Sequence, residues 1–277
     1  MHELPLLIFT LLVQLSVGLT LFITLALPRQ PFGDRAAATR TLRLPLLIAC
    51  ASAGVGLLCS TLHLGYPLNA LHVLRHVSSS WLSREIVFAA AYLAVLGLAT
   101  LLALFKQVLW RTLMPLALVV GIVDVYCMSA IYAYSSVVTW THYTTWLTFF
   151  GSTILLGATA QAWLIARHQA LETRRRLLST GAMLVVAAVA VRLLFQPAYI
   201  EYLSQMVHRD AATFPYRSLD AWYDLANVRA VGWLLAVAGA ALMSVSAQRG
   251  GRGVLICASL ALVLSEVLFR YVFFSLG

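Results

Sequence analysis

The chain has 277 residues, of which 61% are hydrophobic and only 10% are charged. A soluble globular domain is usually about 45–50% apolar and about 25% charged, so this composition excludes an ordinary water-soluble fold. The formal net charge is +9. In a soluble protein that charge would suggest nucleic acid, but here the arginines flank apolar segments, and we expect no nucleic-acid partner.

Apolar segments long enough to cross a lipid bilayer recur along the whole sequence. A membrane-spanning helix needs about 20 mostly apolar residues. The sequence therefore predicts an all-α polytopic membrane bundle, in which residues 1–277 form a single integral membrane domain. We expect about eight spans, near 4–27, 44–63, 85–105, 112–135, 144–166, 177–195, 229–247 and 253–275.

Basic residues are divided unevenly between the connections that alternate along the chain. Twelve Lys and Arg residues lie in one set of connections, where only Asp34 and Glu172 oppose them, whereas the other set holds five arginines. Cytoplasmic connections of membrane proteins are enriched in Lys and Arg. The first set is therefore predicted to be cytoplasmic, and both termini are predicted to lie outside. That set comprises 28–43, 106–111, 167–176 and 248–252.

Two larger connections, 64–84 and 196–228, are predicted on the outer side. The second contains several acidic residues and is rich in Tyr and Trp. Aromatic residues gather at membrane interfaces in general. The segment is therefore either an ordinary interfacial connection or a cap over a site or a partner surface.

His63 and Glu85 lie at the two ends of the connection between the second and third spans. A neutral histidine near a carboxylate can take two protons from a hydroquinone and pass them to water. The structural alternative is a histidine that bonds a carbonyl at its helix end, and a glutamate favoured in the first turn by the helix dipole. The spacing alone leaves both interpretations open.

Four further charged residues lie inside predicted spans, where charge is costly and often functional. Glu266 and Arg270 are four residues apart in the favoured order, so we expect them to form a structural salt bridge. Asp124 lies in the middle of the fourth span and needs a partner or a proton. Arg192 and nearby tyrosines are candidate partners, and a proton relay is an alternative.

The histidine positions argue against a bound haem. A membrane haem usually needs axial histidines inside facing helices, and only His63 borders a span. There is also no run of cysteines with iron–sulfur spacing. We expect no haem or metal in this chain.

Three blocks of sequence resemble the membrane-anchor subunit of dimethyl sulfoxide reductase, the DmsC family. The first is the start at residues 2–10, and the last is Ser265-Glu266-Val267-Leu268-x-Arg270. The most specific block pairs Leu62-His63-Leu64-Gly65-x-Pro67 with Leu82-Ser83-x-Glu85-Ile86. Eight spans with outward termini are also similar to that family.

The resemblance implies a bacterial inner-membrane subunit that oxidises menaquinol and has no catalytic activity alone. Its electrons would pass to an iron–sulfur subunit and then to a molybdopterin catalytic subunit that reduces an S- or N-oxide such as dimethyl sulfoxide. Menaquinol or quinone would be the bound substrate. The expected quinol site comprises His63, Glu85, Tyr66 and Arg84.

Three other functions remain open at this level. In the first, the complex would run in reverse, oxidising an inorganic sulfur compound and reducing quinone. A small-solute or ion transporter would use Asp124 and the Glu266–Arg270 pair, and would need paired broken helices near the membrane midplane. A purely structural anchor would make no use of His63 and Glu85.

Overall fold

A computed structural model describes residues 4–27, 35–63, 74–106, 112–207 and 218–276. The regular secondary structure of these residues is helical throughout, and eight of their helices are long and apolar enough to cross a membrane. A helix satisfies all of its own backbone hydrogen bonds, which lipid cannot do. The predicted all-α membrane bundle is therefore confirmed.

The spanning helices agree with the predicted segments to within a few residues at most ends. They are α1 (Leu4–Ala26), α2 (Arg35–His63), α4 (Trp81–Leu101), α5 (Leu113–Ala133), α6 (Thr144–Leu164), α7 (Leu171–Leu194), α10 (Ala226–Arg249) and α11 (Arg252–Ser275). Shorter helical pieces connect or extend them: η3 (Leu74–His76), η4 (Leu102–Lys106), η5 (Val138–Trp140), η6 (Ala166–His168), α8 (Gln196–Val207) and α9 (Ser218–Asp224).

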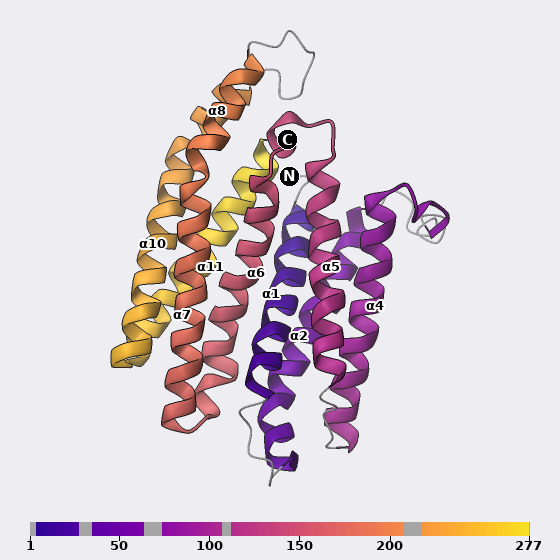
Figure 1. The fold of residues 1–277 in the computed structure, drawn as a ribbon, viewed down its shortest axis with the longest axis vertical. Coiled ribbons are helices and arrows are strands. Elements are labelled where there is room, and N and C mark those ends of the chain that lie inside the picture. Colours follow the sequence, from indigo (N-terminus) through magenta and orange to yellow (C-terminus); the bar gives the residue numbers. More distant parts are fainter. Residues whose placement is uncertain (1–3, 28–34, 64–73, 107–111, 208–217, 277) are drawn as a thin grey trace.

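The helices form two groups of four that meet along α1 and α6 (Figure 1). In the first group α1 packs against α2 and α5, and α4 packs against α5. In the second group α7 packs against α6 and α10, and α10 packs against α11. Figure 1 shows the start of α1 and the end of α11 at the same end of the bundle. We call it the outer end, and the opposite one the inner end, after the orientation that the basic residues predict.

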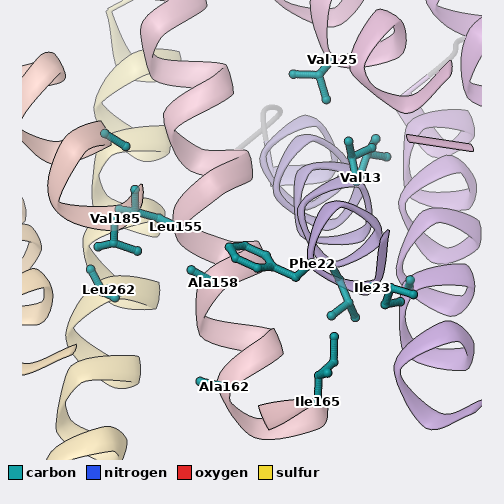
Figure 2. Close-up of a cluster of buried hydrophobic side chains, with 14 of the residues drawn as sticks. Val13, Phe22, Ile23, Val125, Leu155, Ala158, Ala162, Ile165, Val185 and Leu262 are labelled. Atoms are coloured by element: carbon teal, nitrogen blue, oxygen red, sulfur yellow. The ribbon is translucent and has the colours of Figure 1, made fainter. Parts of the chain in front are cut away.

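The α1–α6 seam is the centre of the apolar core (Figure 2). Phe22 of α1 is completely buried and points towards α6. The core continues on both sides of the seam, where Val13 of α1 faces α2 and Ala158 of α6 faces α7. Two glycines bring the helices unusually close. A Cβ atom added to Gly18 would lie 2.0 Å from the carbonyl oxygen of Thr153, so the backbones meet only because this position has no side chain.

The inner end of α4 is held by an arginine from α2. The last turn of α4 widens into the π-helical turn η4, which disturbs the regular ladder of backbone hydrogen bonds. Arg43 donates from Nε to the carbonyl of Ala103 at 3.0 Å and from Nη2 to that of Leu104 at 3.3 Å. The basic residue expected to mark the cytoplasmic side therefore also provides hydrogen bonds to backbone carbonyls of this widened turn.

The connection predicted at 196–228 is shorter than expected, because α7 continues through a bend at Phe195 into α8. Tyr199 and Leu203 of α8 pack with Trp222 of α9 and with the end of α11 in a small apolar cluster. The segment carries Glu201 and several polar residues, so its sequence resembles a loop. Its aromatic residues nevertheless form a cap over the outer end of the second group.

Candidate functional site

An apolar cavity of about 590 Å³ lies between the outer halves of α1, α2 and α4. Glu85 is the one ionisable residue that lines it, among the residues that the structure describes. Its side chain is buried, with 5% exposure, and its Oε1 atom has no hydrogen-bond partner within the described part of the chain. Binding sites for small molecules are typically about 300–1,000 Å³ and mostly apolar with a few polar anchors, so the cavity has the character of a ligand site.

Local structure fixes the position of Glu85 near the start of α4. Ser80 is the N-cap residue, and its side chain accepts a hydrogen bond from the backbone N–H of Ser83. Arg84 reaches back to the preceding turn and donates to the carbonyls of Val77 at 2.9 Å and Ser78 at 2.6 Å. The cap and the arginine together define where the helix begins, so Glu85 faces the cavity and not the solvent.

The structure treats the four predicted quinol-site residues differently. Glu85 lines the cavity. Arg84 does not line it; its guanidinium bonds the turn before α4 and lies 4.2 Å from the Trp81 ring centroid. The α2 helix ends at His63, two residues beyond the cavity-lining Thr61, but the histidine side chain and all of Tyr66 lie outside the described residues.

The other residues that line the cavity could not be identified from the sequence. They include Leu6 and Phe9 of α1, Ser60 and Thr61 in the last turns of α2, and Ala89 and Leu93 of α4. Apolar residues at helical spacing occur on every span, so only the packing of three helices shows which of them face a common space.

Asp124 on α5 is fully buried, and neither of its carboxyl oxygens has a partner among the described residues. The expected help from Arg192 is wrong, because that arginine pairs elsewhere. Asp124 lies close enough to Glu85 for the two carboxyl groups to interact electrostatically. The carboxyl group in the cavity therefore interacts with a second buried carboxyl group.

The expected salt bridge between Glu266 and Arg270 is also wrong. Arg192 of α7 donates from Nη1 to Oε1 of Glu266 at 2.6 Å, and Ser152 of α6 donates to Oε2 at 2.5 Å. Arg270 instead donates to Oε1 of Gln14 at 2.7 Å. Positions four residues apart can meet on an isolated helix, but here side chains from neighbouring helices provide the closer partners.

The fold and the cavity define a class of protein. It is a multi-span helical membrane protein with an apolar pocket between its spanning helices, and one buried carboxyl group lines that pocket. The family model of the DMSO reductase anchor subunit (DmsC) matches residues 1–276, so the protein belongs to the DmsC family and is a membrane anchor of a DMSO reductase complex. The resemblance noted from the sequence is confirmed.

Named relatives support the same family. The protein is 30% identical over 227 residues to the C subunit of anaerobic dimethyl sulfoxide reductase of Escherichia coli, covering 80% of its own length and 78% of that relative. It is 25% identical over 242 residues to the corresponding subunit of Haemophilus influenzae, covering 85% and 84% of the two proteins. It is also 29% identical over 228 residues to the anaerobic dimethyl sulfoxide reductase subunit YnfH of Escherichia coli. No solved structure matches this protein.

Proposed function

We propose that the cavity between α1, α2 and α4 binds a quinol and that Glu85 accepts a proton from it. One observation carries this proposal: the apolar cavity of about 590 Å³ between α1, α2 and α4 is lined by a buried carboxyl group with an oxygen that has no partner among the described residues. A quinol needs an apolar space for its ring and tail, and a hydrogen-bond acceptor for its hydroxyl group.

The proposed reaction is the two-electron oxidation of menaquinol. The quinol loses two electrons and two protons and becomes the quinone. Glu85 takes one proton, and His63 at the end of α2 takes the other, since each can bind a single proton and return it to water. The electrons leave to an iron–sulfur subunit docked at the outer end, which supplies a molybdopterin subunit that reduces an S-oxide such as dimethyl sulfoxide. The complex would lie in the bacterial inner membrane.

Binding of a fluorescent quinol-analogue inhibitor to the purified complex tests the site. We expect Glu85→Gln and His63→Ala to weaken binding by about fivefold or more, because a lost hydrogen bond to a buried group costs about 1–3 kcal/mol. Unchanged binding in both variants would contradict the proposal.

Filling the cavity provides a test that leaves both polar residues intact. Gly54 of α2 lines the cavity, and no atom lies within 4 Å of an added Cβ. A Gly54→Leu side chain would occupy the space of the quinol ring and abolish inhibitor binding. Gly97→Leu is the matched control, because Gly97 on α4 also has nothing within 4 Å and does not line the cavity.

A further inference from the structure

The outer end of the second helix group has more buried positive charge than negative charge. Arg192 and Arg270 are buried and interact electrostatically, and Glu266 is the buried carboxylate that pairs with Arg192. Arg192 also lines a cavity together with the half-buried Arg229. Arg229 forms no ion pair with any described carboxylate. An unpaired cation that is partly withdrawn from water costs free energy, so an additional anion in this region would stabilise the protein.

Two arginine–tryptophan pairs at the outer end provide a direct comparison. The Arg84 guanidinium lies 4.2 Å from the Trp81 ring centroid and also donates to two backbone carbonyls. The Arg229 guanidinium lies 3.5 Å from the Trp222 ring centroid, but its buried Nη1 atom has no partner in the described structure. The guanidinium group of the pair in the first helix group therefore has hydrogen-bond acceptors, whereas that of the pair in the second group lacks one among the described residues.

The incomplete pair lines a small cavity of about 70 Å³. The indole Nε1 of Trp222, a residue with only 7% exposure, also lacks a partner among the described residues. The polar lining also includes Arg192, Gln196 and the hydroxyl-bearing residues Thr139, Thr144, Thr145, Thr148 and Tyr199. A single water needs only about 10–15 Å³ on this measure, so the cavity has room for a small oxyanion.

We propose that this cavity binds a phosphate-type oxyanion held by Arg229 and the Trp222 N–H. An oxyanion accepts hydrogen bonds from both unpartnered donors and neutralises the excess charge. The position at the first turn of α10, where the helix dipole is positive, favours the same ligand. The outer end of a span is also the depth of lipid headgroups, so the phosphate comes either from an anionic phospholipid or from solution.

Ligand-dependent thermal stability of the purified protein tests the proposal. The protein is held in a maltoside detergent, which contains no phosphate, and is titrated with phosphatidylglycerol, phosphatidylcholine or inorganic phosphate. A saturating ligand should raise Tm by about 5 °C, because it binds only the folded state. A response to lipid alone identifies a headgroup site, whereas a response to inorganic phosphate identifies a free-anion site.

Three variants decide whether the response comes from this cavity. Arg229→Gln should lose most of the Tm shift, and Trp222→Phe, which keeps the ring but removes the N–H, should lose part of it. Arg84→Gln is the matched control and should keep the full shift whatever its own starting Tm. No shift with any of the three additives, or an equal shift in Arg229→Gln, would overturn the proposal.

Discussion

Glu266 is completely buried and accepts hydrogen bonds from Arg192 and Ser152. Replacing Glu266 by Gln would leave the Arg192 guanidinium buried without its counter-charge. We expect Glu266→Gln to lower the free energy of unfolding by about 3 kcal/mol. Chemical unfolding of the purified protein in detergent measures this loss.

A double variant separates the ion pair from the loss of packing. In Glu266→Gln/Arg192→Gln both charges are gone, so part of the lost stability should return. A double variant that is less stable than Glu266→Gln would show that the charge pair is not the cause. Glu172→Gln is the control, because its ion pair with Arg176 is exposed and should matter little.

His142 lies outside the spans, between η5 and α6, and is 9% exposed. Its Nδ1 atom lies 2.9 Å from the Thr144 hydroxyl oxygen, and its ring packs against the rings of Tyr143, Tyr199 and Tyr202. Burial lowers the pKa of His142 from its ordinary value of 6.5. The folded protein therefore resists protonation of this ring.

This burial predicts a stability that decreases in mild acid. Below pH 6.5 the unfolded chain takes up a proton at His142, whereas the folded chain stays neutral until its lower pKa is reached. The contribution of His142 is thus fully present above pH 6.5 and is lost as the pH falls through the folded pKa. We expect Tm to decrease between pH 7.5 and pH 5.0, and His142→Gln to reduce that decrease. Replacing the exposed His76 should leave it unchanged.

Individual site residues were predictable only where local sequence decides their surroundings. Glu85 follows the Ser80 cap by about one and a half turns, so its place near the start of a span could be inferred from the chain alone. The partner of Glu266 could not, because Arg192 is 74 residues away and the Arg270 position on the same helix offered a local alternative. The i, i+4 spacing predicts contacts within one helix, whereas the buried charges here pair with side chains of neighbouring helices.

At the scale of elements, α1 and α6 are joined by their smallest residues. A Cβ on Gly18 would lie 2.8 Å from Cα of Gly157 and still closer to the Thr153 carbonyl, and both contacts are with backbone atoms that cannot rotate away. Gly18→Ala should therefore push the helices apart and lower the free energy of unfolding by about 1–3 kcal/mol.

The matched control for this helix contact is Gly97→Ala. An added Cβ at Gly97 meets nothing within 4 Å, and alanine is the better helix former by about 1 kcal/mol. This variant should be neutral or slightly more stable in the same unfolding measurement. Equal losses in both variants would mean that the α1–α6 contact is not what makes Gly18 necessary.

The spanning helices were predictable because lipid imposes their length and apolar character. The α8 helix was not, since Glu201 and its polar neighbours interrupt the apolar pattern that marks a span. It forms because Tyr199 and Leu203 pack against Trp222 and the end of α11, a contact between segments far apart in the sequence. Tertiary packing, and not local composition, decides the structure there.

At the scale of the whole molecule, both proposed sites lie at the outer end. The carboxyl-lined cavity belongs to the first helix group, and the arginine–tryptophan cavity belongs to the second. A partner subunit docked on this end would therefore contact both groups, and would lie close to the quinol site that we propose at Glu85. The side of the membrane that the outer end faces therefore decides on which side the partner subunits would dock.

The asymmetry of basic residues predicts that the outer end faces away from the cytoplasm. Exposed Ser79 precedes α4 at this end, whereas exposed Glu172 begins α7 at the opposite end (Figure 1). Single cysteines at these positions, in a protein whose four native cysteines are replaced by alanine, can be labelled with a membrane-impermeant maleimide. Ser79→Cys should react in intact spheroplasts, and Glu172→Cys only after permeabilisation. The reverse pattern would contradict the charge rule alone, whereas reaction of both from one side would contradict the fold.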